Sequence, residues 1–287
     1  MRTLKITSPS NPMIREALRI REKRGKYRNA AFLVEGPHLM DMAISSPYTG
    51  IKRVFFTEAF RGREEGRQLL GRVAQKGDAG SSGRGEREVF LLEIPEPLLS
   101  RIAGTETPQG IVAIVSYPVT ALGDIAFRDV PFLVVCDGIQ DPGNLGTIIR
   151  VADAAGADGV VILPGSCDVF MPKTVRATAG SLFSLPIAYS SPDALADYFE
   201  VSGIMLAVAD VRAEVPVYAF DFARPVAVAF GNEAHGPGRE LRERAKGLVK
   251  IPIIGKAESL NVAMSATVCL YEAVRQRWFS GGRGAED

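Results

Sequence analysis

Three short polar segments in the second half of the chain hold the residues best suited to chemistry. They are residues 144–150 (NLGTIIR), residues 231–236 (GNEAHG), and residues 251–253 (IPI) followed by 259–263 (SLNVA). Each segment lies where a predicted strand ends or a predicted helix begins. Ligands of open α/β sheets bind outside the carboxyl ends of the strands. We therefore expect the three segments to form one composite site.

The elements that must position these segments follow from the apolar pattern. Apolar runs predict strands at residues 31–34, 54–56, 89–92, 111–115, 132–136, 159–163, 204–209, 226–230 and 248–252. Helical spacing and helix-start signals predict helices at residues 14–21, 37–43, 64–73, 97–102, 144–156, 172–179, 192–199, 238–245 and 261–279. This alternation is typical of an α/β fold with a mostly parallel sheet and helices on both faces.

The length of 287 residues is sufficient for two domains, each with its own core. We expect a smaller α/β domain at residues 1–117, a linker at 118–128 and a second α/β domain at 129–287. Residues 76–85 (KGDAGSSGRG) are rich in Gly and Ser and lack apolar anchors. Such a composition predicts a mobile loop in the first domain.

Cysteine and histidine usage argues against metal and disulfide chemistry. Cys136, Cys167 and Cys269 form no C-x-x-C pair, and His38 and His235 are the only histidines. We therefore expect no metal site, and cysteines that stay reduced. No apolar run is long enough to span a bilayer, and the N-terminus lacks the apolar core of a secretory signal. These features predict a cytoplasmic protein with no membrane partner.

Positive charge is concentrated near the N-terminus. The whole chain has a formal net charge of +1, but residues 1–28 hold nine Lys or Arg and two Asp or Glu, which gives that segment +7. A local excess of this size can supply contacts to nucleic-acid phosphates. A solvated basic helix would show the same composition, so the charge alone leaves both interpretations open.

In order and spacing, the three segments resemble the motifs of the SpoU (TrmH-like) family of RNA ribose 2′-O-methyltransferases, of the SPOUT superfamily, which use S-adenosyl-L-methionine. The resemblance covers residues 130–280 strongly and the N-terminal third more weakly, and residues 107–110 (TPQG) recur in the family as well. It implies an α/β trefoil-knot domain preceded by a ribosomal-protein-like RNA-binding domain, and a homodimer. The implied reaction is methyl transfer to a ribose of structured RNA, with 23S rRNA favoured, and no metal.

The resemblance also implies roles for particular residues. Its catalytic positions match Asn144, Arg150, Glu233, Ser259 and Asn261. Its donor-binding positions match Gly231, Ile251 and Leu260, with the strand end at Ala207 and Ala209 close by.

Local sequence offers simpler interpretations of several of these residues. Asn144, Ser259 and Asn261 would each suit the first position of a helix, where a polar side chain satisfies a free backbone N–H group. Ile251 and Leu260 would also suit a hydrophobic core. For Asn144 and Asn261, capping a helix and arranging a site are compatible.

The role expected of Arg150 departs from what has been proposed for similar enzymes, in which the matching arginine accepts the ribose proton. Because arginine stays protonated in proteins, we expect Arg150 instead to hold an RNA phosphate and to stabilise the developing alkoxide. The proton would then pass to water or phosphate. Glu233 is expected to orient Asn144 or Arg150. Family members usually have Gly where this chain has Ala234, and we interpret His235 as a loop residue.

Other classes of protein compete with this interpretation. A dinucleotide-binding oxidoreductase would carry G-x-G-x-x-G after its first strand, and residues 143–146 (GNLG) lack that spacing. A phosphate-binding G-x-x-x-x-G-K-[ST] loop is also missing from the sequence. A catalytically silent RNA-binding protein and a tRNA 2′-O-methyltransferase would both share the resemblance. The silent protein is disfavoured because all five catalytic positions are filled.

Overall fold

The computed structural model describes residues 3–22, 31–79 and 89–279. The chain forms two compact units. One unit comprises Met1–Pro118 together with Phe170–Arg176, and the other comprises Val119–Val169 and Ala177–Asp287. The predicted mobile loop begins inside a helix, since residues 76–79 continue α4, and its remainder lies outside the described residues. Residues 23–28 of the basic N-terminal segment also lie outside them.

The N-terminal unit is built on a mixed sheet with the strand order β1-β4-β3-β5-β2. Its strands are β1 (Thr3–Lys5), β2 (Ala31–Glu35), β3 (Gly50–Phe56), β4 (Phe90–Glu93) and β5 (Ile111–Ser116). Its helices are α1 (Pro12–Glu22), α2 (Pro37–Ser45), α3 (Glu58–Gly62), α4 (Glu64–Ala79) and α5 (Glu96–Ile102). Strand β5 runs antiparallel to both β2 and β3, whereas β1, β3 and β4 are parallel.

A short segment from later in the chain completes this unit. It ends in α7 (Pro172–Ala177). Phe170, just before α7, stacks on Phe32 of β2 with ring centroids 4.9 Å apart, and its centroid lies 5.5 Å from that of Tyr117. The sequence pattern places this segment in the second domain, but these aromatic contacts join it to the first unit.

The C-terminal unit contains a seven-stranded, fully parallel sheet with the order β10-β12-β9-β11-β6-β7-β8. Its strands are β6 (Phe132–Cys136), β7 (Gly159–Ile162), β8 (Ile187–Tyr189), β9 (Met205–Ala209), β10 (Val215–Pro216), β11 (Val226–Phe230) and β12 (Gly247–Lys250). Its main helices are α6 (Pro142–Ala154), α8 (Pro192–Ser202), α9 (Arg239–Arg244) and α10 (Val262–Val274), and a π-helical segment, Arg275–Phe279, follows α10. Short 3₁₀ turns lie at Leu122–Asp124, Ser181–Phe183 and Val217–Ala219.

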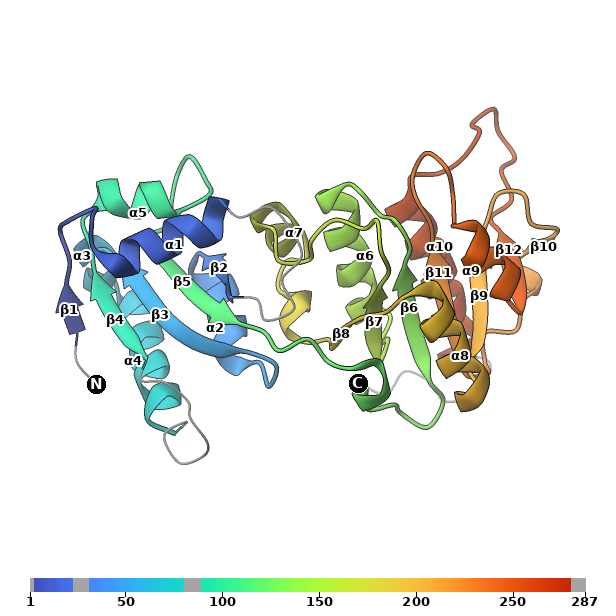
Figure 1. The fold of residues 1–287 in the computed structure, drawn as a ribbon, viewed down its shortest axis with the longest axis horizontal. Helices are drawn as coiled ribbons and strands as arrows, with labels where there is room; N and C mark the ends of the chain where they lie inside the picture. Colours follow the sequence, from blue (N-terminus) through green and yellow to red (C-terminus); the bar gives the residue numbers. More distant parts are fainter. Residues whose placement is uncertain (1–2, 23–30, 80–88, 280–287) are drawn as a thin grey trace. The chain divides into compact units, whose positions relative to one another are not determined.

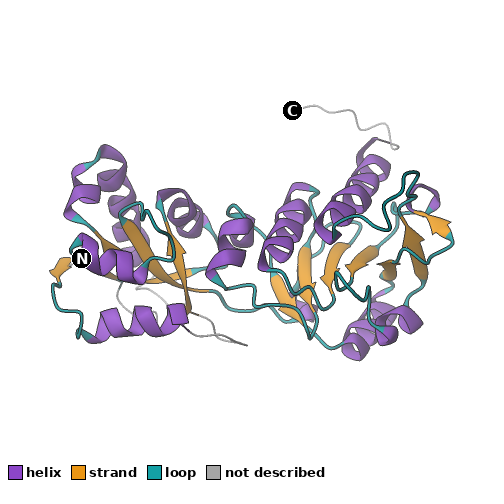
Figure 2. Ribbon diagram, turned by 90° about the horizontal axis from the view of Figure 1, so that it is seen from above, coloured by secondary structure: helices purple, strands orange, loops and turns teal. Residues whose placement is uncertain are grey.

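Figure 1 labels these elements, and Figure 2 shows helices on both faces of the sheet. Every residue of β6 and of β11 is buried, as is typical of central parallel strands, which have apolar runs on both faces. The prediction of a mostly parallel α/β fold is confirmed. No helix in the described part of the chain is long and apolar enough to cross a membrane.

Helix α10 packs against α6 through one apolar face. Ala266, Cys269, Leu270 and Ala273 on this face are each buried within the unit itself. These four residues form an apolar stripe that therefore belongs to the core of a single chain. The trefoil knot itself stays a prediction.

Candidate active site

Helix α6 begins at Pro142, two residues before Asn144. Asp141 is its N-cap and accepts a hydrogen bond from the Asn144 backbone N–H at 2.9 Å, and Pro142 fills the first helical position. The alternative interpretation of Asn144 as the cap is therefore wrong. Because Asp141 satisfies the backbone, the Asn144 side chain is available for other contacts.

The amide of Asn144 joins the other two motifs. Its Nδ2 donates to Oε1 of Glu233 at 3.0 Å, and its Oδ1 accepts from Nδ2 of Asn261 at 3.0 Å. Asn261 in turn caps α10, since its Oδ1 accepts from the backbone N–H groups of Ala263 at 2.9 Å and Met264 at 3.4 Å. One continuous chain of hydrogen bonds therefore runs from Glu233 through Asn144 to the start of α10.

Glu233 is held from several directions. Besides Asn144, its carboxylate accepts from the backbone N–H groups of Gln140 and Asp141, each at 3.3 Å. Burial acts to raise the pKa of Glu233, but the hydrogen bonds from Asn144 and the backbone outweigh it and hold the pKa below its ordinary value. Glu233 is thus a fixed carboxylate that is ionised at neutral pH.

The loop that carries Glu233 is shaped by close backbone packing. A Cβ atom on Gly231 would lie 2.1 Å from the backbone nitrogen of Pro237, so only glycine fits there. Gly236 has φ +72°, which a side chain would strain. The loop closes through a hydrogen bond from the Gly236 N–H to the Asn232 carbonyl at 2.9 Å.

Asn232 also explains why the loop tolerates alanine at position 234. Its Oδ1 accepts from the N–H groups of Ala234 at 2.9 Å and His235 at 3.1 Å, which forms an Asx turn. Among the described residues, the single non-glycine with positive φ is Ala179, so position 234 does not require glycine. The Asn232 Nδ2 donates to the Gly138 carbonyl at 2.8 Å and ties the loop to the end of β6.

A carboxylate that the sequence analysis missed lies beside this loop. Asp137 directly follows β6, and its Oδ2 accepts from the Gly238 N–H at 2.7 Å, where α9 begins. Burial raises the pKa of Asp137, and the hydrogen bond from Gly238 offsets this only in part. An acidic residue directly after a buried strand was the available signal.

The residues expected to bind the donor lie along the same sheet edge. Ala209 ends β9, Gly231 follows β11 and Ile251 follows β12, and these three strands are neighbours in the sheet. Ala207 lies in the middle of β9 and is fully buried. Leu260 is 39 % exposed, which rules out the interpretation of this residue as core. Ile251 is half-buried.

Two of the expected catalytic residues do not join the hydrogen-bonded chain. Arg150 is exposed, six residues beyond Asn144, or about 9 Å along the helix. Within residues 3–22, 31–79 and 89–279, neither the Arg150 side chain nor the Ser259 side chain has a hydrogen bond or ion pair. The structure thus brings together Asn144, Glu233 and Asn261 and leaves the other two side chains free for a ligand.

Comparisons with known proteins identify the family of the chain. The model of the SpoU rRNA methylase family matches residues 131–271, and that of the MRM3-like substrate binding domain matches residues 11–113. An uncharacterized tRNA/rRNA methyltransferase of Synechocystis is 31 % identical over 97 % of this chain and 96 % of its own length. The Bacillus subtilis 23S rRNA (guanosine(2553)-2′-O)-methyltransferase RlmP is 30 % identical, over 93 % of this chain and 97 % of its own.

Solved structures give the same result. The crystal structure of an AdoMet-bound rRNA methyltransferase from Sinorhizobium meliloti is 32 % identical, covers 95 % of this chain and 98 % of its own, and superposes with a TM-score of 0.82. The chain belongs to the SpoU rRNA methylase family. It is an S-adenosyl-L-methionine-dependent methyltransferase with an N-terminal substrate-binding domain, as its three motifs predict.

Proposed function

We propose that this protein transfers the methyl group of S-adenosyl-L-methionine to a ribose 2′-hydroxyl of 23S rRNA. The observation that carries the proposal is the hydrogen-bonded chain from Glu233 through Asn144 to Asn261, which fixes all three motifs at one sheet edge. The 23S rRNA named for RlmP of B. subtilis supports this RNA as the substrate.

In the reaction, the ribose oxygen attacks the methyl carbon, the sulfonium sulfur leaves as a neutral thioether, and the hydroxyl loses its proton. Rate comes largely from holding the two reactants in line, because a well-oriented pair reacts almost intramolecularly. The donor would lie against Gly231, Ile251 and Leu260, at the end of β9. The position of these residues supports this, because Gly231 and Ile251 follow β11 and β12, the two neighbours of β9 in the sheet.

Glu233 and the two asparagines act as positioning residues in this proposal. The carboxylate of Glu233 already accepts hydrogen bonds from Asn144 and two backbone N–H groups, which leaves it poorly suited to take a further proton. Arg150 is free of protein partners among the described residues and stays charged, so it would hold an RNA phosphate and stabilise the developing alkoxide. Ser259, also free, would contact the donor's methionyl end.

The test uses tritiated S-adenosyl-L-methionine with unmodified 23S rRNA, 16S rRNA and tRNA transcripts. We expect label in 23S rRNA, with none from an Asn144→Ala enzyme that folds normally. Primer extension at low nucleotide concentration would then locate the 2′-O-methyl group. Label in tRNA would favour the tRNA enzyme, and donor binding without transfer to any of the three RNAs would contradict the proposal.

We also propose that two copies associate through the exposed face of α10. Met264 is 63 % exposed and Tyr271 is 50 % exposed, and their seven-residue spacing places them close to one line along α10. Trp278, 53 % exposed, lies in the π-helical segment that follows α10. Exposed large apolar side chains that share a face are typical of an interaction surface. A Tyr271→Glu variant should become monomeric by light scattering, whereas Val201→Glu, at a position 89 % exposed on α8, should not.

If the wild-type protein is monomeric at micromolar concentration, the dimer proposal is wrong. Action on ribosomal RNA also supports the prediction of a cytoplasmic location. Tagged protein that fractionates with the membrane rather than with ribosomes would contradict that location.

A further inference from the structure

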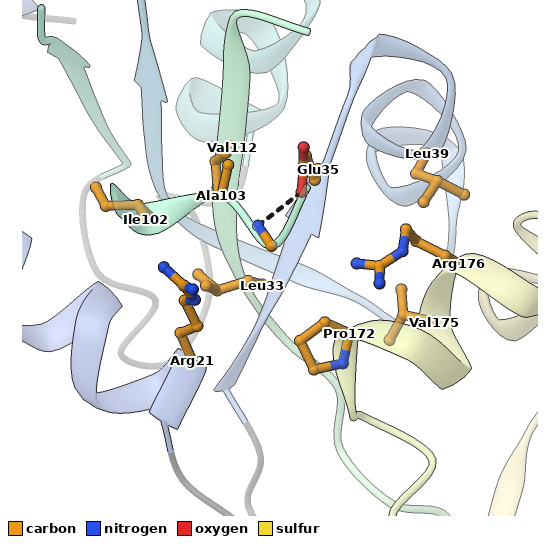
Figure 3. Close-up of a pocket in the computed structure, with 11 residues that line it drawn as sticks. Arg21, Leu33, Glu35, Leu39, Ile102, Ala103, Val112, Pro172, Val175 and Arg176 are labelled. Carbon is orange, nitrogen blue, oxygen red and sulfur yellow. Dashed lines mark hydrogen bonds between the residues drawn. The ribbon is translucent and has the colours of Figure 1, made fainter. Parts of the chain in front are cut away.

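A small hollow in the N-terminal unit is bordered by two arginines. Arg21 extends from the last turn of α1 and Arg176 from the last turn of α7, and Figure 3 shows both side chains at its edge. The walls between them are mostly apolar, formed by Leu33, Leu39, Ile102, Val112, Pro172 and Val175.

The one carboxylate in the hollow is engaged by the backbone and a hydroxyl group, and neither arginine neutralises it. Glu35 Oε2 accepts from the Gly104 N–H at 3.0 Å, and its Oε1 accepts from the Thr105 hydroxyl. No ion pair joins Glu35 to Arg21 or Arg176, all three of which the structure describes. The carboxylate therefore holds the loop after α5.

Both arginines keep donors available for a ligand. One N–H of Arg21 is used by the backbone carbonyl of Arg101, which fixes the direction of the side chain. The side chain of Arg176 has neither a hydrogen bond nor an ion pair within the described ranges. Its Nη1 lies only 3.2 Å from the place where a Cβ of Gly104 would be, so the bare glycine makes room for it.

The size of the hollow limits what can bind. Its interior has about 10 Å³ of free space, roughly enough for one water molecule. A nucleobase or a metabolite cannot enter, so a ligand must lie across the rim and contact the guanidinium groups. An oxyanion carried on a polymer backbone can lie across the rim in this way. The planar guanidinium group of arginine binds two phosphate oxygens at once.

We propose that Arg21 and Arg176 together hold one backbone phosphate of the RNA substrate. This site rests on the proposed function, because the RNA it grips is the one that is methylated. Arg176 lies within residues 131–271, matched by the methylase family, and outside residues 11–113, matched by the substrate-binding domain. The methyltransferase half of the sequence thus contributes a residue to the RNA-binding unit.

The test compares Arg21→Ala, Arg176→Ala and the double variant with wild type, by fluorescence anisotropy with a 23S rRNA fragment at several salt concentrations. Arg67→Ala is the matched control, since Arg67 is an exposed arginine of the same unit that is paired with Glu64. Each single variant should bind RNA about threefold to tenfold more weakly, with a salt slope reduced by about 0.7–0.9. The double variant should lose less than the product of the two single losses, because both side chains hold the same phosphate.

Calorimetric titration of S-adenosyl-L-methionine and thermal unfolding should match wild type for all variants, which excludes a general loss of structure. Equal RNA affinity and salt slope in wild type, Arg176→Ala and the control would overturn this site while leaving the proposed function intact. Failure of the wild-type protein to bind 23S rRNA would instead overturn the proposed function, and this site with it.

Discussion

Replacing Asn144 with aspartate should lower the activity of the enzyme while leaving its fold in place. The change keeps the shape of the side chain but turns the Nδ2 donor into an oxygen. That oxygen would face Oε1 of Glu233 across the present 3.0 Å hydrogen bond. The contact with Asn261 remains, because the Oδ1 that accepts its hydrogen bond is unchanged.

The size of the effect follows from the lost bond. A hydrogen bond to a charged acceptor contributes about 1.5–3 kcal/mol, and each 1.36 kcal/mol is a factor of ten in rate. Because Glu233 is largely exposed, water screens the new repulsion between the two carboxylates. We therefore expect kcat/KM to fall by about tenfold to 150-fold, with little change in donor affinity.

Two measurements distinguish loss of the Asn144–Glu233 hydrogen bond from a general loss of structure. Adding Glu233→Gln to Asn144→Asp restores a donor facing an acceptor, so the double variant should regain part of the activity in the tritium-transfer assay. The deficit of the single variant should also narrow as pH falls, because a proton shared by two close carboxylates restores the bond. A single variant as active as wild type, or a folded double variant with no recovery at any pH, would refute the reasoning.

Other predictions concern the loop and the core. Gly231→Ala places a Cβ 2.1 Å from the Pro237 nitrogen, so calorimetry should show donor affinity weakened by at least about tenfold, or roughly 1.4 kcal/mol; unchanged affinity would mean that the loop is free to shift. Asp137→Asn keeps an acceptor for the Gly238 N–H but removes an acid whose pKa is raised in the folded protein. In the wild type, the folded protein therefore binds the Asp137 proton more tightly than the unfolded protein does. The contribution of Asp137 to stability is therefore present at acid pH and is lost as pH rises through the raised pKa. The variant should have a higher melting temperature than wild type near pH 7, and this difference should vanish towards acid pH. A gain in melting temperature that does not depend on pH would contradict this. Burial raises the pKa of Cys269 to about 12, so iodoacetamide at about pH 8 should leave it unmodified until the protein unfolds, and rapid labelling of the native protein would show otherwise.

The sequence predicted the long elements well and the short ones poorly. Strands β6 and β11 were visible because every position is apolar, which reflects burial on both faces. Strands β1, β8 and β10 have three, three and two residues and were not predicted. Such short strands exist because a neighbouring strand offers hydrogen-bonding partners, and that neighbour is distant in the sequence.

The candidate site shows the same division. That the three motifs meet at one edge followed from the sequence, because carboxyl ends of parallel strands share an edge. The sequence did not predict that Asn144 contacts Glu233 and Asn261, which lie 89 and 117 residues away along the chain. It also did not predict that Asp141, and not Asn144, caps α6. These contacts depend on the conformations of the loops, which the local pattern of apolar and polar residues does not specify.

The sequence by itself determined the α/β class, because the apolar pattern along the chain carries that information. The resemblance of its three motifs to the SpoU family implied the family of the enzyme and the use of S-adenosyl-L-methionine. Only the tertiary structure decided that Asp137 fixes the start of α9 and that the apolar stripe of α10 packs on α6. It also decided that Phe170–Arg176 belongs to the N-terminal unit. The reason is physical: each of these facts is a contact between segments far apart in the chain, and side-chain packing in three dimensions, not periodicity, selects such contacts.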